Sequence, residues 1–325
     1  MVQYTIHTCT LCEEKMTSDA YTARLLIAPT VSAIGGVLAE LIIESCCKPA
    51  LHSRGAFTIA LSGGSLPSFL QELPSYCRRA GVDPQWEKWH VFLADERCVV
   101  STDAESNLGS IQSNFTNSVC SMPMHLPVHI DTSINHYQLY SVCLFLNYIQ
   151  VPIPKWQVYG INEALLTEST EAVASAYEEK ILKPLLELSG GMIDCVLLGF
   201  GPDGHTCSLF PNHPLLKEQS RLVAPIDDSP KSPPSRITLT FPVLNNLSRQ
   251  IIFCGAGLSK RPILSAVFRS TTHELIPEST DQTHLSSARA MTVQIVDPSP
   301  YPCGMVRTEQ GGDTLVWVVD ADALE

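Results

Sequence analysis

The sequence has no apolar run as long as the roughly 20 residues that a membrane-spanning helix requires, and it has no excess of basic residues. Its 325 residues include 21 Lys and Arg against 33 Asp and Glu, which gives a net charge of -12 at pH 7. Proteins that bind nucleic acids present a basic face, so we expect neither a membrane nor a nucleic acid as a partner. An anionic small molecule remains compatible with this charge, because a few local Lys and Arg side chains can make a positive pocket on an acidic protein.

The sequence also lacks the patterns of a serine hydrolase and of a zinc site. No Gly-x-Ser-x-Gly elbow occurs, and that elbow carries the nucleophile of many hydrolases. Cys9 and Cys12 have Cys-x-x-Cys spacing, but no second pair or histidine cluster follows them, as a zinc site would need. We therefore expect no metal and no cofactor. The 12 cysteines are scattered, and no secretory signal stands at the start, which favours reduced thiols and a cytoplasmic protein.

Length and composition are those of a globular protein with a buried core. Hydrophobic residues make up 45% of the chain and charged residues 17%, values that are ordinary for folded proteins. Residues 1–19 have no clear period and are interpreted as a candidate disordered extension. No internal repeat or linker divides the rest. Residues 20–325 are therefore predicted to form a single α/β domain, with an atypical insertion at about 119–150.

Four apolar segments are predicted to be strands that lead directly into polar turns. Each has little polar alternation, which is typical of a parallel strand covered on both faces. Because ligands bind beyond the carboxyl ends of the strands in an open α/β sheet, we expect one crevice along one edge of one sheet. The four segments are 56–61, 89–94, 193–199 and 250–254.

Periodicity predicts further elements along the chain. A helix is expected over 20–44, interrupted by Pro29, and an amphipathic helix over Thr170–Leu188, capped by Ser169 or Thr170. The other predicted elements are strands at 157–162, 236–240 and 315–320 and a helix at 241–247.

The turn after the third apolar segment carries the strongest candidate for catalysis. His205 follows a Gly-Pro-Asp-Gly turn and stands where we expect the next helix to begin, two residues after Asp203. A carboxylate can orient an imidazole, and the free amides at a helix start can bind an anion. These residue types are the ingredients of a general base beside an anion site, although a lone histidine in a glycine-rich turn is more often structural.

The string over residues 201–211, Gly-Pro-Asp-Gly-His-Thr-Cys-Ser-Leu-Phe-Pro, closely resembles the signature of the 6-phosphogluconolactonases. Two further segments resemble that family, namely Asp95-Glu96-Arg97 and Glu105-Ser106-Asn107. The resemblance implies a doubly wound, mostly parallel sheet with helices on both faces, as in glucosamine-6-phosphate deaminase and ribose-5-phosphate isomerase. It also implies hydrolysis of 6-phospho-D-glucono-1,5-lactone, the second step of the oxidative pentose phosphate pathway. We expect the chain to be a monomer or weak homo-oligomer.

The resemblance assigns a role to each candidate site residue. His205 is expected to activate water, with Asp203 orienting its ring. Arg97, its direction set by Asp95 and Glu96, is expected to act as a planar fork for phosphate or for the charge that develops on the lactone oxygen. The remaining residues are expected to bind the sugar phosphate lactone, without a metal: Ser62, Gly63, Gly64, Ser65, Asn107, Arg236 and Lys260.

About 32 residues look inserted relative to the family, because Ser113-Asn114-Phe115 and residues 151–155 stand nearly side by side in it. Such a length far exceeds the usual two- to six-residue connection of these folds. One explanation is a surface loop. The other, which we favour slightly, is a translated intron, since Val119-Cys120 permits the codons of a donor site and Gln150 those of an acceptor.

Two other functions remain open at this stage. A deaminase or isomerase of the same fold would need a base that removes a carbon-bound proton, and the family cue for it, an acidic pair in place of Asp-Gly-His-Thr, is absent. A non-catalytic sugar-phosphate binding protein would result if the insertion blocked the cleft. Ammonia release from glucosamine 6-phosphate would favour the first, and phosphogluconate binding without hydrolysis the second.

Overall fold

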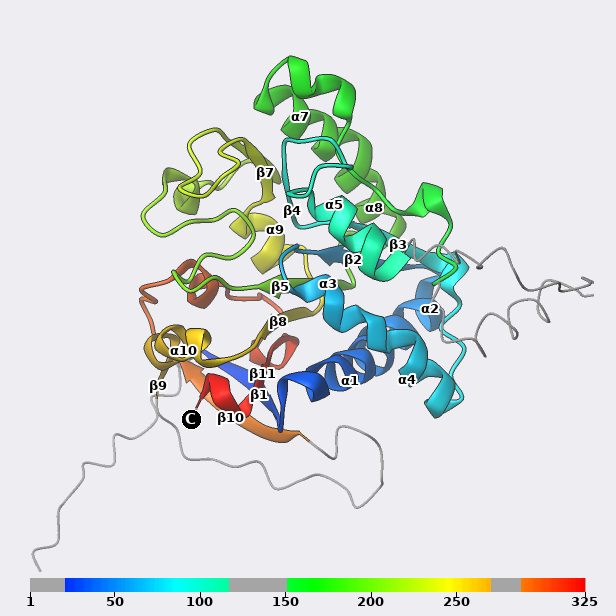
Figure 1. Cartoon of the computed structure of the whole chain (residues 1–325), viewed down its shortest axis with the longest axis vertical. Coiled ribbons are helices and arrows are strands. Elements are labelled where there is room, and N and C mark those ends of the chain that lie inside the picture. Colours follow the sequence, from blue (N-terminus) through cyan, green and yellow to red (C-terminus); the bar gives the residue numbers. More distant parts are fainter. Residues whose placement is uncertain (1–20, 117–150, 270–287, 325) are drawn as a thin grey trace, which may run out of the picture.

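The computed structural model describes residues 21–116, 151–269 and 288–324 (Figure 1). The expected extension at 1–19 and the insertion at 119–150 therefore lie outside the described residues.

A mostly parallel sheet of eight strands forms the centre of the fold, in the order β3-β2-β5-β8-β11-β1-β10-β9. Neighbouring strands from β3 to β1 run parallel, whereas β10 and β9 are antiparallel. The expected α/β class is confirmed. The strands are β1 (Thr22–Ala28), β2 (Phe57–Leu61), β3 (Trp89–Leu93), β5 (Cys195–Gly199), β8 (Ile251–Gly255), β9 (Phe268–Arg269), β10 (Arg289–Ile295) and β11 (Leu315–Asp320).

Helices flank this sheet (Figure 1). Helix α1 packs against β1 and β11, and α4 packs against α1. The helices are α1 (Val31–Leu41), α2 (Lys48–Arg54), α3 (Leu66–Phe69), α4 (Leu73–Ala80), α5 (Asn107–Ile111), α7 (Thr170–Tyr177), α8 (Lys183–Leu188), α9 (Phe241–Asn246) and α10 (Arg261–Val267). In the part of the chain that the structure describes, none of them is long and apolar enough to cross a membrane.

Most of the predicted strands and helices are confirmed. The strands expected at 56–61, 89–94, 193–199, 250–254 and 315–320 are β2, β3, β5, β8 and β11. The helix expected over 170–188 is a continuous helical run in which a π-helical turn, Glu178–Leu182, joins α7 to α8. Its cap is Ser169, whose side chain accepts a hydrogen bond from the backbone N–H of Ala172, satisfying one of the free amides of a helix start.

The single helix expected over 20–44 is wrong in its first part. Residues 22–28 form β1, which pairs with β11 on one side and β10 on the other. An apolar run such as Leu25–Ala28 fits a strand as well as a helix, and Pro29 holds the residue before it in an extended conformation. The helix begins only at Val31. Strand β10, the partner that decides the outcome, was not predicted.

The strand expected at 157–162 is also wrong. Residues 155–157 form a 3₁₀ turn, and only Val158 makes a β-bridge, to Val91 of β3. The Gln157 amide donates hydrogen bonds to the backbone oxygens of Trp89 at 2.7 Å and Glu87 at 2.9 Å. The backbone N–H of Tyr159 also donates to the oxygen of Val91 at 2.8 Å, so this segment joins β3 through a single bridge and the Gln157 side chain rather than through a full strand.

A small antiparallel sheet, in the order β4-β7-β6, lies beside the large one. Its strands are β4 (Asp95–Arg97), β7 (Arg236–Leu239) and β6 (Val223–Ile226). The charged triplet 95–97, expected only to follow a strand, is thus itself a strand. The backbone N–H of Leu239 donates to the oxygen of Ala94 at 2.8 Å, which ties β7 to the end of β3.

A buried carboxylate fixes the edge of the sheet opposite the polar turns. Asp194 is 2% exposed, and its Oδ2 accepts hydrogen bonds from the backbone N–H and the hydroxyl of Thr58, both at 3.0 Å. Its Oδ1 pairs with Arg54 and lies 3.4 Å from Nε of Arg249. These contacts join β5 to β2 and satisfy a charge that would otherwise be costly to bury.

We expect Asp194→Ala to lower the free energy of unfolding by about 3–5 kcal/mol, because it leaves two guanidinium groups and the Thr58 donors without their partner. Urea denaturation of both proteins measures the loss. Asp228→Ala is the control, since the Asp228 side chain is 79% exposed and its loss should change stability by about 0.5 kcal/mol or less. A loss below about 1 kcal/mol in Asp194→Ala would show that the cluster is not an anchor.

Candidate active site

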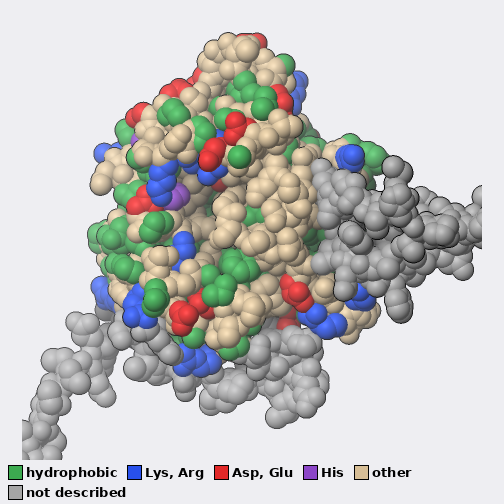
Figure 2. Space-filling model, viewed as in Figure 1, with side chains coloured by type: hydrophobic (Ala, Val, Ile, Leu, Met, Phe, Trp, Pro, Cys, Tyr) green, Lys and Arg blue, Asp and Glu red, His purple; other side chains and the backbone are tan. Residues whose placement is uncertain are grey.

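The polar turns that follow β3, β2, β5 and β8 meet at one edge of the large sheet, because these four strands are consecutive neighbours and parallel. The expected crevice is present there as a cavity of about 200 Å³. In the space-filling view, Lys and Arg side chains lie beside a histidine on this face, with acidic side chains interspersed (Figure 2). The cavity is lined by Ser62, Gly63, Gly64, Ser65, Leu66, Asp95, Arg97, Asn107, Gly199, Phe200, Gly201, His205, Cys207, Arg236, Cys254 and Lys260.

All the candidate residues named from the sequence except Asp203 line this cavity. Asp203 lies directly behind it, where its Oδ1 contacts Nδ1 of His205. The structure thus brings the ten together from six separate parts of the chain. Their individual roles remain predictions.

His205 and Asp203 form a pair with a defined chemical sense. A carboxylate only accepts, so the Asp203 contact places the ring proton on Nδ1 and leaves the Nε2 lone pair available as a base. Burial lowers the pKa of His205 below its ordinary value of 6.5, while Asp203 acts in the opposite direction. A neutral imidazole at neutral pH follows, which is the form a general base needs.

The backbone around His205 leaves no room for a larger residue at Gly201. A Cβ on Gly201 would lie 2.1 Å from the imidazole ring, so only glycine permits the turn to fold over the ring. The ring also stacks on Phe210, with 4.9 Å between the ring centroids. Gly201 and Phe210 therefore both constrain the position of the imidazole.

The helix expected to begin near His205 is absent, and this expectation is corrected. Residues 200–211 form a turn closed by hydrogen bonds from the backbone N–H of Gly201 to the oxygen of His205 and from Gly204 to Gly201, both at 2.9 Å. The next helical residues are a 3₁₀ turn, Pro214–Lys217. The start of a helix therefore supplies no anion site at His205 in this part of the described chain, and an anion there would bind other groups that line the cavity.

The turn after β2 supplies a close backbone approach and a free hydroxyl. A Cβ on Gly63 would lie 1.8 Å from Oδ1 of Asn107, so glycine is required for this approach to the cavity. The Ser62 hydroxyl is buried and has no hydrogen-bond partner among the described residues. A buried polar group in that state calls for a partner, and a ligand oxygen in the cavity would provide one.

Two arginines lie side by side on neighbouring strands of the small sheet. The register of β4 and β7 pairs Arg97 with Arg236, and like charges directly opposite each other are destabilising. Burial, followed by the charge of Arg97, lowers the pKa of Arg236. Both side chains line the cavity. An anion bound there would relieve the repulsion.

The expectation that Asp95 and Glu96 fix the direction of the Arg97 side chain is wrong, because Glu96 contacts Arg97 only at its backbone N–H, at 2.7 Å. Asp95 accepts from the Ser208 hydroxyl at 3.0 Å, and Glu96 accepts from the backbone N–H groups of Asn107 and Leu108 at the start of α5, both at 2.8 Å. These carboxylates hold the turns together. Arg97 instead pairs with Glu105, whose carboxylate lies 3.3 Å from Nη1.

Lys260 reaches the cavity from the turn after β8. Its ammonium donates to the backbone oxygen of Phe200 and lies 5.0 Å from the centre of the Phe200 ring. Burial lowers the pKa of Lys260 below its ordinary value of 10.5. The side chain thus adds a partly desolvated positive charge on the far side of the His205 turn.

Lys231 belongs to this site and was missed by the sequence reasoning. Its Nζ lies 3.1 Å from Oδ1 of Asp203 and 3.1 Å from Nδ1 of His205. The proline-rich segment that carries Lys231 has no periodicity, and a lysine in a loop is usually solvated. Only the fold shows that this loop returns to His205.

Cysteine nucleophiles and metal ligands do not fit the described residues. Cys207 and Cys254 line the cavity, but burial raises the pKa of Cys254 to about 12 and that of Cys207 well above its ordinary value, so both remain neutral thiols. Within residues 21–116, 151–269 and 288–324, no group of three or more His, Cys, Asp or Glu side chains could hold a metal ion.

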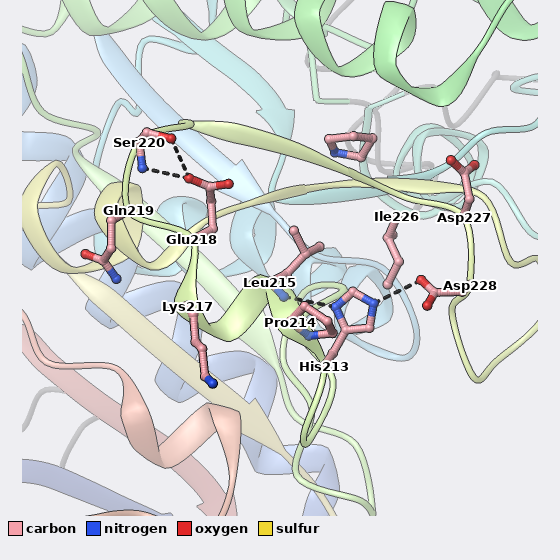
Figure 3. Close-up of a pocket in the computed structure, with 11 residues that line it drawn as sticks. His213, Pro214, Leu215, Lys217, Glu218, Gln219, Ser220, Ile226, Asp227 and Asp228 are labelled. Atoms are coloured by element: carbon pink, nitrogen blue, oxygen red, sulfur yellow. Dashed lines mark hydrogen bonds and ion pairs between the residues drawn. The ribbon is translucent and has the colours of Figure 1, made fainter.

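A larger hollow of about 660 Å³ lies around His213 and shares no lining residue with the cavity (Figure 3). The His213 imidazole accepts a hydrogen bond from the backbone N–H of Leu215 at 3.2 Å and lies 3.0 Å from Asp228. Hydrogen bonds from the backbone and hydroxyl of Ser220 lower the pKa of Glu218 to about 2. These polar groups of the hollow already form hydrogen bonds with one another. The smaller cavity, which His205 lines, is therefore the candidate active site.

Sequence comparison relates the chain to proteins of known name. The family described as glucosamine-6-phosphate isomerases/6-phosphogluconolactonase matches residues 31–288. The chain is 35% identical over 254 residues to a 6-phosphogluconolactonase of Homo sapiens, covering 77% of this chain and 83% of the relative. It is 36% identical over 247 residues to a 6-phosphogluconolactonase of Bos taurus, covering 75% and 81%.

Solved structures share the fold. The 6-phosphogluconolactonase from Thermotoga maritima aligns with a TM-score of 0.57 at 22% identity, over 91% of this chain and 97% of that one. The 6-phosphogluconolactonase from Trypanosoma brucei aligns with a TM-score of 0.60 at 18% identity, over 94% and 98%. At these identities the likeness establishes the arrangement of strands and helices alone.

Proposed function

Because the chain belongs to the glucosamine-6-phosphate isomerase/6-phosphogluconolactonase family, we propose that it hydrolyses 6-phospho-D-glucono-1,5-lactone to 6-phospho-D-gluconate, a step of the pentose phosphate pathway. One observation carries the proposal. His205, which contacts Asp203 through Nδ1 and keeps its Nε2 lone pair free, lines one cavity together with Arg97 and Arg236. A base and an anion site at such close quarters suit a phosphorylated ester.

The ester carbonyl of the lactone is already electrophilic, so the reaction needs no covalent nucleophile. Nε2 of His205 removes a proton from water as the water oxygen bonds to the carbonyl carbon, and Asp203 stabilises the imidazolium that forms. Arg97 stabilises the negative charge on the carbonyl oxygen. The carbonyl then re-forms, the bond to the ring oxygen breaks, and His205 returns the proton to that oxygen. The products are the hydroxyl and the carboxylic acid.

The phosphate binds remotely from the reacting carbonyl and positions it. Arg236 and Lys260 supply positive charge, and the turn Ser62, Gly63, Gly64 and Ser65 supplies amide and hydroxyl donors. Asn107 lies against that turn and contacts the sugar hydroxyls. Arg97 and Arg236 thereby each receive a negative partner, the developing oxyanion and the phosphate, which removes the repulsion between them.

The deaminase or isomerase alternative is not favoured. The family includes both activities by its description, but the human and bovine relatives are both named 6-phosphogluconolactonase. The turn after β5 also carries Asp203 and His205 rather than an acidic pair. Release of ammonia from glucosamine 6-phosphate by the purified chain would reverse this preference.

We expect the purified chain to release acid from freshly prepared lactone faster than spontaneous ring opening, with a rate that depends on pH. Hydrolysis needs the neutral imidazole, so kcat/KM is at its plateau above the pKa of His205 and falls as pH drops through it. Burial lowers that pKa, which places the decline below pH 6.5. A pH-stat assay measures both. A rate equal to spontaneous opening at every pH rejects the function.

The compartment and the oligomeric state are finer parts of the proposal. We take the chain to act in the cytoplasm as a monomer or weak homo-oligomer, where its reaction supports NADPH production. Four Oryza sativa relatives carry the word chloroplastic in their names, so organelle import is the competing outcome. Imaging of the tagged chain and light scattering test these two points.

A further inference from the structure

Lys231 lies at the back of the proposed catalytic pair. Its ammonium is 3.1 Å from Oδ1 of Asp203 and 3.1 Å from Nδ1 of His205, and the same carboxylate oxygen contacts the ring. An ammonium only donates and a carboxylate only accepts. With the ring proton on Nδ1 pointing at Asp203, Lys231 can donate to Asp203 but can only repel the ring when the ring is charged.

The loop that carries Lys231 is held in place from several directions. Ser229 accepts from the backbone N–H of Lys231 at 3.2 Å and donates to its oxygen at 2.9 Å. The Arg236 guanidinium donates to the oxygens of Lys231 at 2.8 Å, Ser232 at 3.0 Å and Pro233 at 2.8 Å. The position of the ammonium is therefore set by the loop and by Arg236, a proposed phosphate ligand.

We propose that Lys231 is a positioning residue, whose ammonium orients Asp203 toward His205 and keeps the His205 ring neutral with Nε2 free for water. This inference rests on the proposed function, because it assumes that His205 is the base. Lys231 contacts the pair from behind and does not line the cavity, so it acts through His205 and Asp203.

Charges on several elements act on the ring, and Lys231 opposes the acidic ones. Asp203 and Asp95 favour the imidazolium, whereas Lys231 disfavours it. Partial burial of Asp203 raises the pKa of its carboxyl group, but the hydrogen bonds with His205 and Lys231 outweigh this effect and hold that pKa below its ordinary value. The charged groups that face His205 or share its cavity are Asp203, Lys231, Asp95, Arg97, Arg236 and Lys260.

The direct test is an NMR titration of the His205 ring in the full chain, with the resonance assigned by comparison with His205→Gln. In Lys231→Met the pKa should rise by about 0.5–1 unit, since a positive charge some 3 Å away is removed from a partly exposed site. Lys231→Arg retains the charge and should titrate like the wild type. Lys217→Met, a lysine of the His213 hollow, controls for net charge and should leave His205 unchanged.

The activity gives a second readout. The acid limb of kcat/KM in Lys231→Met should move to higher pH by the same amount, while KM for the lactone changes little. The inference is overturned if, in Lys231→Met, both the acid limb of kcat/KM and the pKa of His205 from NMR stay within about 0.2 unit of the wild-type values. It is also overturned if Lys231→Arg shows the same shifts as Lys231→Met. If the wild-type chain hydrolyses no lactone, the proposed function fails, whereas the titration still reports whether Lys231 controls the ring.

Discussion

Replacement of His205 by alanine is expected to lower kcat/KM for the lactone by at least about 100-fold, within the range that general base catalysis contributes. The loss should fall on kcat, because the alanine removes the base and leaves Arg97, Arg236 and Lys260 around the same cavity. Binding of the product, 6-phosphogluconate, should therefore persist. A pH-stat assay measures the rate, and calorimetry measures the binding.

His213→Ala is the matched control for this experiment. His213, like His205, contacts an aspartate, but it lines the separate hollow of Figure 3. Its replacement should leave hydrolysis within about twofold of the wild type. Circular dichroism and thermal melting of both variants exclude misfolding, which matters because His205 also stacks on Phe210. Full hydrolysis by His205→Ala would reject the assignment of the base.

The positions of the site turns could be predicted because each follows a strand of its own. Strands β2, β3, β5 and β8 are apolar almost throughout, and such runs identify parallel strands without knowledge of their partners. Parallel strands end at the same edge of a sheet, so the turns were expected to meet. The sequence order of the strands does not give their spatial order, and the adjacency β3-β2-β5-β8 became known only from the structure.

The errors share a cause, which is dependence on distant partners. Residues 22–28 form a strand because β10 and β11, about 260 to 290 residues further along the chain, pair with them. The triplet 95–97 is a strand because β7 lies alongside it. The carboxylates of Asp95 and Glu96 bind Ser208, the start of α5 and the backbone N–H of Arg97, rather than the Arg97 guanidinium. Local pattern carries no record of such contacts, and Lys231 was missed for the same reason.

The facing arginines make the anion site itself testable. Arg97 and Arg236 are register partners in β4 and β7, and a pair of like charges held together without a bound anion weakens the fold slightly. Removing either one from a protein without anion relieves repulsion, but removing it from the complex loses a charge-assisted hydrogen bond. Loss of Arg236 therefore relieves repulsion in the free protein but weakens the complex with the anion. Substrate affinity measures its binding role more directly than protein stability does.

Arg236→Ala is expected to raise KM for the lactone and the dissociation constant of 6-phosphogluconate by about 10- to 100-fold, since a hydrogen bond to a charged group contributes about 1.5–3 kcal/mol. Arg236→Lys should not restore the affinity, because a lysine side chain lacks the planar fork of the guanidinium. Arg236 also holds the Lys231 loop, so a second variant is needed to separate substrate binding from the order of that loop. Lys260 contacts Phe200 instead. Lys260→Ala should therefore weaken binding while the acid limb of kcat/KM stays at the same pH. Arg221→Ala is the control, because Arg221 forms an exposed ion pair with Glu171 and does not line the cavity. Affinity within about threefold of the wild type in both site variants would mean that the phosphate binds elsewhere.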